Sequence, residues 1–279
     1  MSIGSVVAVS LGIIVLPSPP PLAPEHFVRQ QPVADTMVDV GGHRLRFSVW
    51  DGEGPVTIVF EAGGGADASS WASVPELVSA RTRARVVTYD RAGLGQSDRG
   101  PLELTPVDEI HHLHAALRHL GVSGPTLVVG HSYGGVLALL HAALYPDEII
   151  GLVLVDPMNP GFVEAVGIDW LQKTIPDVPN PTTDREYVTH RLKRDFPDLV
   201  QQTGKVWLSL ELRIDILTAG QAWWGAEDID GAWRKSHEEM AAATSARELV
   251  VAESSAHNIP ATEPELIVDA VSRLVGEIN

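Results

Sequence analysis

Cysteine is absent from this 279-residue sequence. Its absence excludes disulfide bonds, a thiolate nucleophile and any metal site built on thiolate ligands. It does not indicate a compartment, because chains without disulfides occur both inside and outside the cell.

Basic residues are few. Lys and Arg total 20 against 36 Asp and Glu, a formal net charge of -16. Phosphate backbones repel such a chain, so we expect no nucleic-acid partner. In other respects the composition is that of a globular protein, with 44% hydrophobic residues. The length suffices for one large domain with a sizeable core and an additional cap.

Long hydrophobic runs are also scarce, and residues 3–16 form the clearest one. Such a run is too short to span a bilayer comfortably but matches the core of a signal peptide. No Lys or Arg precedes Arg29, and residues 17–24 are rich in proline. Residues 1–34 are therefore either an export signal or membrane anchor, or a helix on the domain surface. The chain is accordingly cytoplasmic or exported, and we expect membrane contact only if this segment is an anchor.

Apolar strand patterns alternate with helical ones along most of the remaining chain. A hairpin is predicted over residues 36–50, and strands over residues 56–61, 84–89, 125–129, 149–155, 212–219 and 247–252. Nearly continuous apolar strands separated by helices predict an α/β fold with a mostly parallel, doubly wound sheet. Residues 158–210 lose this rhythm and carry prolines and many charges. We therefore predict a core of residues 35–157 and 211–279, with a helical cap inserted at residues 158–210.

The most informative turn is Gly-His-Ser-Tyr-Gly at residues 130–134. An apolar strand precedes it and an apolar helical pattern follows it. This is the context of a nucleophile elbow, in which a strained serine projects its hydroxyl from the sheet and small neighbours avoid a clash. Ser132 is thus the candidate nucleophile. The alternative is a glycine-rich turn that only packs a helix on a sheet.

Together with other segments, this turn resembles the α/β-hydrolase superfamily, over about residues 36–279. The resemblance is to a serine-nucleophile, esterase-like member with a cap. The segments that carry it are Phe-Glu-Ala-Gly-Gly-Gly at 60–65, Asp-Arg-Ala-Gly-Leu-Gly-Gln-Ser-Asp at 90–98, the turn at 130–135, Gly-Leu-Val-Leu-Val-Asp-Pro at 151–157, and Ser-Ser-Ala-His at 254–257.

A serine hydroxyl needs a base that removes its proton during attack. His257 follows a late predicted strand and precedes the last predicted helix. The order serine, acid, histidine also places the base late in the chain. His257 is therefore the candidate base, and a surface loop histidine is the alternative.

The third member, a carboxylate that orients the histidine, has two candidate positions. Asp156 ends the strand that follows the nucleophile helix, and haloalkane dehalogenase-like members of the superfamily carry their acid there. The more usual position follows the next strand, but Trp223 stands where the acid is expected. Glu227 and Asp228 are the alternatives in that loop. The alternative for Asp156 is that it only caps the following turn as part of an Asp-Pro pair and has no catalytic function.

Two backbone amides are expected to bind the oxyanion of the reacting carbonyl. Tyr133, directly after the nucleophile, supplies one. By resemblance Gly64 supplies the other, with Gly63 and Gly65 as neighbouring candidates. A tight turn without catalytic function is the alternative. Glu61 precedes this turn and either lines the pocket or simply ends its strand.

These residues predict a serine hydrolase that cleaves carboxylic esters, including lactones, through an acyl-enzyme and without a cofactor or metal. Its partner is a small-molecule ester, and the sequence indicates no oligomeric state. Amide or carbon–carbon bond hydrolysis by the same triad is the alternative within enzymes. A non-catalytic small-molecule receptor on this fold is the alternative outside them.

Overall fold

The computed structural model describes residues 31–205 and 212–278. The predicted signal or anchor segment, residues 1–34, therefore lies almost wholly outside the described residues. Within those ranges, no helix is both long and apolar enough to cross a membrane.

The described residues form one sheet with the strand order β1-β2-β4-β3-β5-β6-β7-β8. Strands β1 and β2 pair antiparallel, as do β2 and β4, and every later pairing is parallel. The predicted α/β fold with a mostly parallel sheet is confirmed. The strands are β1 (Ala34–Asp39), β2 (Arg44–Trp50), β3 (Thr57–Glu61), β4 (Arg85–Tyr89), β5 (Thr126–His131), β6 (Ile149–Val155), β7 (Arg213–Ala219) and β8 (Arg247–Ala252).

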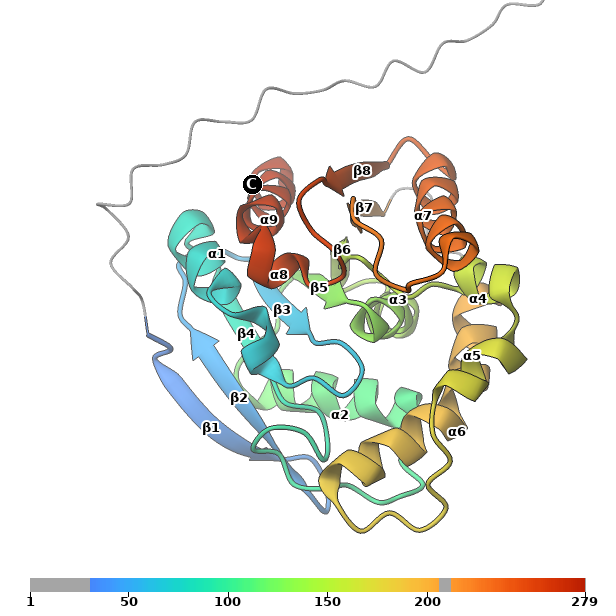
Figure 1. The fold of residues 1–279 in the computed structure, drawn as a ribbon. Coiled ribbons are helices and arrows are strands. Elements are labelled where there is room, and N and C mark those ends of the chain that lie inside the picture. The colour runs from blue at the N-terminus through green and yellow to red at the C-terminus, as the bar shows by residue number, and fades with distance from the viewer. Residues whose placement is uncertain (1–30, 206–211, 279) are drawn as a thin grey trace, which may run out of the picture.

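Helices cover both faces of this sheet (Figure 1). Alternate side chains of β5 show why both faces are apolar. Leu127 and Val129 pack in the cluster that includes α9, whereas Val128 packs with α3. Successive strand residues point to opposite faces, so a strand covered on both sides is apolar throughout. The helices are α1 (Val74–Thr82), α2 (Pro106–His119), α3 (Tyr133–Leu144), α4 (Pro160–Val166), α5 (Ile168–Thr174), α6 (Asp184–Lys205), α7 (Glu227–Ala242), α8 (Ile259–Thr262) and α9 (Pro264–Ile278), with a 3₁₀ turn at Ala68–Trp71.

The start of helix α2 is capped by its own residues. Thr105 accepts a hydrogen bond from the backbone N–H of Asp108, whose carboxylate accepts one from the backbone N–H of Thr105. Pro106 occupies the first turn, where its missing N–H costs nothing. This reciprocal capping fixes the start of the helix beside the sheet.

Three helices, α4, α5 and α6, lie between β6 and β7, within the segment predicted as a cap. The helical apolar periodicity of this segment is weak in the sequence because α6 buries charged side chains on its inner face. Arg191 and Asp195 are both buried, and Arg191 donates to Glu109 of α2 at 3.0 Å and to the carbonyl of Leu104 at 3.1 Å. Polar residues at buried positions interrupt the apolar periodicity by which amphipathic helices are recognised.

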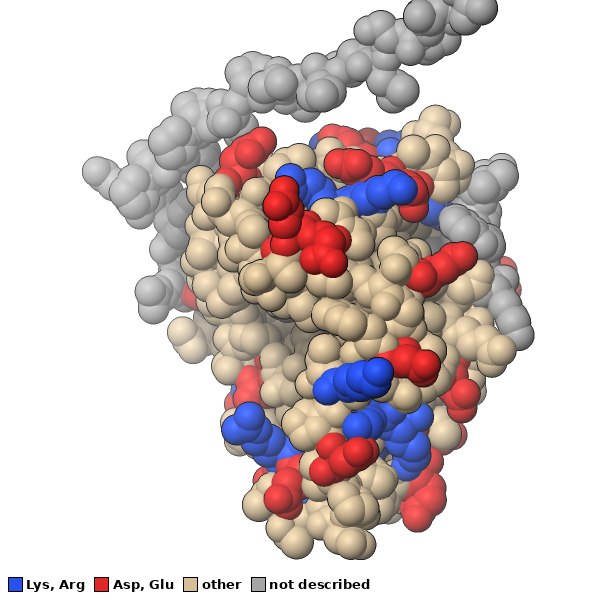
Figure 2. Space-filling model, turned by 45° about the vertical axis from the view of Figure 1, so that its right-hand side comes forward, with Lys and Arg blue, Asp and Glu red and all other residues tan. Residues whose placement is uncertain are grey.

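Charged side chains of both signs lie next to one another on the face shown in Figure 2. Arg118 pairs with Glu148 at 2.9 Å, and Arg81 pairs with Asp269 at 2.9 Å. These basic side chains already have carboxylate partners, which reduces their attraction for other anions.

Candidate active site

Ser132 lies between β5 and α3 in a strained conformation, with φ 53° and ψ -120°. Positive φ in a residue other than glycine costs free energy and persists only where the surroundings enforce it. Two hydrogen bonds do so here. The N–H of Ser132 donates to Val155 at 3.1 Å, and its carbonyl accepts from Met158 at 2.9 Å. The elbow is therefore fastened to the end of β6.

The glycines of the elbow are required by space. A Cβ at Gly130 would lie 2.5 Å from the Gly134 carbonyl oxygen, and one at Gly134 would lie 2.1 Å from that of Glu61. A Cβ at Gly135 would lie 2.5 Å from Pro157. The pattern in the sequence thus reflects backbone segments that approach too closely for any side chain.

Asp156 follows β6 directly and is completely buried. Its Oδ2 accepts a hydrogen bond from Nδ1 of His257 at 2.6 Å. Its Oδ1 accepts from the backbone N–H of Ala219 at 3.0 Å and from the indole N–H of Trp233 at 2.9 Å. All three donors stabilise the ionised carboxylate, since each hydrogen bond favours the charged form.

Burial alone would raise the pKa of Asp156. The hydrogen bond from His257, the electrostatic effects of His237 and His257, and the hydrogen bond from the Ala219 amide together outweigh burial. They hold the pKa of Asp156 below its ordinary value. Because an ionised carboxylate only accepts hydrogen bonds, Nδ1 of His257 carries a proton. The neutral form of His257 then has its free electron pair on Nε2, which suits it to act as a base.

His257 lies in the loop between β8 and α8, with about a quarter of its side chain exposed. Its backbone carbonyl is 2.9 Å from Nε2 of His131 in the elbow. The two imidazole rings have centroids 4.7 Å apart. These contacts place His257 against His131, the residue that precedes Ser132 in the elbow, although no hydrogen bond joins the Ser132 hydroxyl to His257 within the described residues. In free enzymes such bonds often tighten only when substrate is bound.

The glycine turn after β3 lies against the elbow. A Cβ at Gly63 would be 3.5 Å from Cβ of Ser132, and one at Gly64 would be 3.3 Å from Cβ of Tyr133. Tyr133 begins α3, so its N–H belongs to the first turn, where backbone donors have no partner inside the helix. Gly64 and Tyr133, whose amides are predicted to bind an oxyanion, therefore lie against each other, and Gly63 lies against Ser132.

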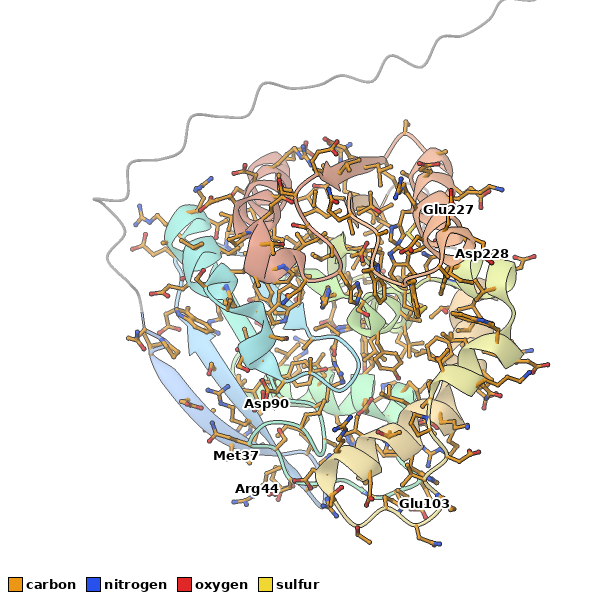
Figure 3. The ribbon with its side chains drawn as sticks, in the orientation of Figure 1. Met37, Arg44, Asp90, Glu103, Glu227 and Asp228 are labelled. Atoms are coloured by element: carbon orange, nitrogen blue, oxygen red, sulfur yellow. The ribbon has the colours of Figure 1, made fainter. Side chains whose placement is uncertain are left out.

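Glu227 and Asp228, the alternative acids, lie in the first turn of α7, where their side chains are exposed (Figure 3). The buried carboxylate of that turn is Asp230. Its Oδ1 accepts hydrogen bonds from the backbone N–H groups of Trp223 and Trp224, each at 2.9 Å. Asp230 thus fixes the backbone of the loop after β7, where the alternative acids were predicted. Both of these hydrogen bonds go to that loop, and neither involves His257.

Several residues of the site have no signal in a single sequence. The sequence predicts that the backbone of His131 matters more than its ring, but the ring contacts His257. Trp233 is a helix residue whose indole N–H happens to reach Asp156. His237, also on α7, donates through Nε2 to the Pro157 carbonyl at 2.8 Å. These contacts join segments far apart in the chain, so only the fold reveals them.

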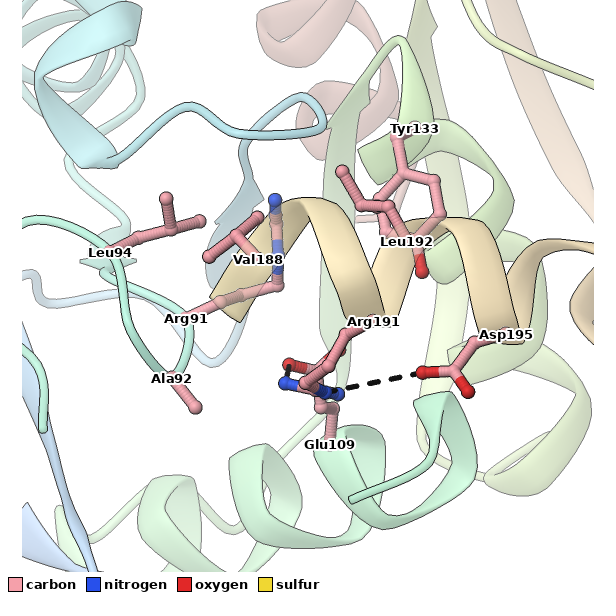
Figure 4. Close-up of a pocket in the computed structure, with 9 residues that line it drawn as sticks. All are labelled: Arg91, Ala92, Leu94, Glu109, Tyr133, Val188, Arg191, Leu192 and Asp195. Atoms are coloured by element: carbon pink, nitrogen blue, oxygen red, sulfur yellow. Dashed lines mark hydrogen bonds and ion pairs between the residues drawn. The ribbon is translucent and has the colours of Figure 1, made fainter. Parts of the chain in front are cut away.

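A cavity of about 20 Å³ lies beside Tyr133, beneath α6 (Figure 4). Such a volume holds about one water molecule. Arg91, Arg191 and Leu192 are among the residues that line it. Among the described residues, no three His, Asp or Glu side chains come together as metal ligands.

Comparisons with known proteins connect this geometry to one family. The model of the alpha/beta hydrolase family matches residues 58–270. The uncharacterized protein YqjL of Bacillus subtilis is 29% identical over 219 residues, which cover 77% of this chain and 82% of that protein. The 2-hydroxy-6-oxo-2,4-heptadienoate hydrolase of Pseudomonas putida is 31% identical over 157 residues, which cover 55% of each chain.

Among solved structures, a thermophilic esterase from Thermogutta terrifontis is similar with a TM-score of 0.61 and 19% sequence identity. The similarity covers 89% of this chain and 99% of that one. At this level of identity the likeness concerns the fold.

Proposed function

The chain belongs to the alpha/beta hydrolase family, and from this membership and the geometry of the site we propose that it is a serine hydrolase of carboxylic esters, lactones among them. The observation that carries the proposal is the 2.6 Å contact between Nδ1 of His257 and the buried carboxylate of Asp156, next to a serine at a strained elbow.

In the first half of the reaction, the Ser132 hydroxyl attacks the carbonyl carbon of the ester. Nε2 of His257 takes the hydroxyl proton, and Asp156 stabilises the resulting imidazolium through its hydrogen bond to Nδ1. The carbonyl oxygen becomes negatively charged, and the amides of Tyr133 and Gly64 donate to it. The tetrahedral intermediate collapses, His257 protonates the departing alkoxide, and an acyl-enzyme remains.

In the second half, water replaces the alcohol. His257 takes a proton from the water as its oxygen attacks the acyl carbon, and the same two amides receive the second oxyanion. Collapse breaks the bond to Ser132, whose oxygen recovers the proton from His257. The products are a carboxylic acid and an alcohol, or a single hydroxy acid when the substrate is a lactone.

Amide or carbon–carbon bond hydrolysis by the same residues is the competing assignment, and the name of the Pseudomonas putida relative supports testing it. Ester hydrolysis differs from these reactions in its leaving group, which is an alkoxide and not an amine or a carbon atom. A panel of p-nitrophenyl esters of graded acyl length, with lactones, anilides and a vinylogous 1,5-diketone alongside, separates these reactions. The highest kcat/KM is expected for an ester or lactone.

A fluorophosphonate probe tests the serine itself. We expect rapid labelling of the wild-type protein at Ser132 and none in Ser132→Ala, together with loss of turnover by several orders of magnitude. Turnover that survives in Ser132→Ala would reject the mechanism. A wild-type protein that resists labelling would instead favour a small-molecule receptor.

A further inference from the structure

The glycine turn after β3 is held from behind by Arg91. Nη1 of Arg91 donates to the carbonyl of Ala62 at 2.5 Å, and Nη2 donates to the carbonyl of Gly63 at 2.5 Å. The Gly63 carbonyl also accepts from the N–H of Ala66 at 3.2 Å. Two successive peptide groups of the turn are therefore oriented by one guanidinium, whose planar fork suits two acceptors at once.

The Gly63 carbonyl and the Gly64 N–H belong to the same peptide group. No peptide bond of the described residues is cis. In a trans peptide the N–H points opposite to the C=O. When Arg91 holds the carbonyl on its own side, the Gly64 N–H is consequently directed away from Arg91. A hydrogen bond to a carbonyl also polarises the peptide and strengthens its N–H as a donor.

Arg91 is itself fixed by buried partners. Its Nη1 lies 2.9 Å from Oε1 of Glu61, and the Tyr89 hydroxyl donates to Oε2 of Glu61 at 2.5 Å. The side chains of Arg91 and Glu61 are 5% and 1% exposed. In such surroundings water does little to screen the charge of the guanidinium.

The same guanidinium contacts the second proposed donor. It lies over the ring of Tyr133, 5.6 Å from the ring centroid. Arg91 and Tyr133 line one cavity, as Figure 4 shows. One buried cation therefore touches both chain segments whose amides we assign to the oxyanion.

We propose that Arg91 is a positioning residue for the oxyanion site, and that Glu61 holds it in place. Arg91 orients and polarises the Gly63–Gly64 peptide, so that the Gly64 amide is already aligned when negative charge develops. This role rests on the proposed function, because it has no meaning without an oxyanion at Ser132. It also assigns a use to Glu61, which the sequence leaves as a strand end or a pocket residue.

The test must avoid leaving Glu61 as an unpaired buried charge, which is strongly destabilising by itself. We therefore compare Glu61→Gln with the double variant Glu61→Gln/Arg91→Met, so that the two proteins differ only at Arg91. Arg91→Lys is a second probe, since it keeps the charge but loses the fork that spans two carbonyls. Circular dichroism and thermal unfolding verify that each variant is folded.

A second buried arginine that lines the cavity provides a matched control. Arg191 is a buried arginine that pairs with Glu109 and has no hydrogen bond to the glycine turn. Glu109→Gln and Glu109→Gln/Arg191→Met repeat the design there. General loosening of the domain would affect both pairs of variants, whereas loss of oxyanion alignment affects only the pair at Arg91.

The measurements are kcat and KM for p-nitrophenyl butyrate and the inhibition constant of phenylboronic acid, which forms a tetrahedral anion on a serine. Removing an oxyanion donor costs about 100- to 1000-fold in kcat, so misaligning one should cost about 10- to 100-fold. We expect that loss in kcat and an equal loss in boronate affinity for Glu61→Gln/Arg91→Met relative to Glu61→Gln, with little change in KM. Arg91→Lys should show a smaller loss of the same kind.

A folded Glu61→Gln/Arg91→Met or Arg91→Lys that binds boronate as well as its reference would overturn the role of Arg91. So would an equal loss in the Arg191 control pair. Failure of the proposed function is recognised separately, because wild-type protein would then bind no boronate, or Ser132→Ala would remain active. If wild-type Ser132 binds boronate and the Arg91 variants do too, only the inference about Arg91 fails.

Discussion

The indole of Trp223 lies flat against the imidazole of His257, with ring centroids 3.9 Å apart and planes 15° apart. Trp223 occupies the position at which the sequence leads one to look for a carboxylate. It faces the histidine from that loop as an aromatic surface, and Asp230 holds its backbone in place. An aromatic face stabilises a cation that lies on it.

Replacing Trp223 should therefore slow the reaction without removing any triad residue. A stacked cation contributes about 0.5–2 kcal/mol, so Trp223→Leu should lower kcat by about 2- to 30-fold. Trp223→Phe should retain most of the rate. The control is Trp170→Leu, which removes an indole that packs against Trp224 instead of His257. Equal losses in Trp223→Leu and Trp170→Leu would show that the effect is one of packing.

Substitution distinguishes the two candidate positions of the acid. Asp156→Asn should reduce kcat by about 10,000-fold, as loss of the orienting carboxylate does in related triads. Glu227→Gln and Asp228→Asn change exposed side chains at a helix N-terminus and should alter kcat by less than about threefold, as surface substitutions do. Steady-state kinetics at pH 8 decides, and the opposite ranking would move the acid to the loop after β7.

Stability should fall with acid because several histidines, His131 and His141 among them, have lowered pKa values in the folded chain. Burial, with His257 nearby, lowers the pKa of His131 to about 4, and burial, with His114 nearby, lowers that of His141 to about 3. An unfolded histidine titrates near 6.5, so between these values the unfolded chain binds protons that the folded chain does not. Their stabilisation is complete above pH 6.5 and is lost as the pH falls toward 4.

Urea unfolding at pH 7 and pH 4.5 measures this loss. The two histidines together should remove about 5 kcal/mol of unfolding free energy over that interval. His141→Leu should make this loss smaller by about 2.5 kcal/mol, which is the share of that histidine. Parallel pH dependences for wild type and His141→Leu would contradict the assignment.

The glycines of the chain should differ sharply in tolerance. Gly134→Ala places a Cβ 2.1 Å from one backbone oxygen and 2.6 Å from another, so one chain segment must move. We expect a loss of several kcal/mol in unfolding free energy or insoluble protein, as overpacking of fixed backbone produces. Gly231→Ala, inside α7 with no atom within 4 Å, should raise stability by about 0.5–1 kcal/mol. Thermal unfolding compares the two variants.

Most of the fold is predictable from the sequence. Each predicted strand is present, with ends shifted by a residue or two, because buried strands are apolar runs bounded by Gly, Pro and Asp. The helices between β6 and β7 are less visible, since α6 buries Arg191 and Asp195 where the periodicity would require apolar residues. The helical patterns that follow the strands in the sequence begin at Val136 and near residue 231, whereas α3 begins at Tyr133 and α7 at Glu227.

The site, too, has features that the sequence predicts and features that it does not. That Ser132 and Asp156 share one edge follows from parallel strands, whose carboxyl ends meet on one side of the sheet. Which carboxylate the late histidine contacts depends on the paths of two loops, and the sequence leaves this open between Asp156 and the pair Glu227 and Asp228. Contacts between side chains that lie far apart in the chain, such as Trp233 of α7 to Asp156 after β6, have no periodic or local signal at all.

The position of Asp156 before α4 determines how the protein divides when it is cut. Severing the chain between β6 and β7 leaves Ser132, Asp156 and the two amides proposed for the oxyanion on the N-terminal fragment. The C-terminal fragment carries His257 and also two donors to Asp156, the Ala219 amide and the Trp233 indole. Under the proposed function neither half holds the whole triad, so hydrolysis by a mixture of the two halves would report their reassociation.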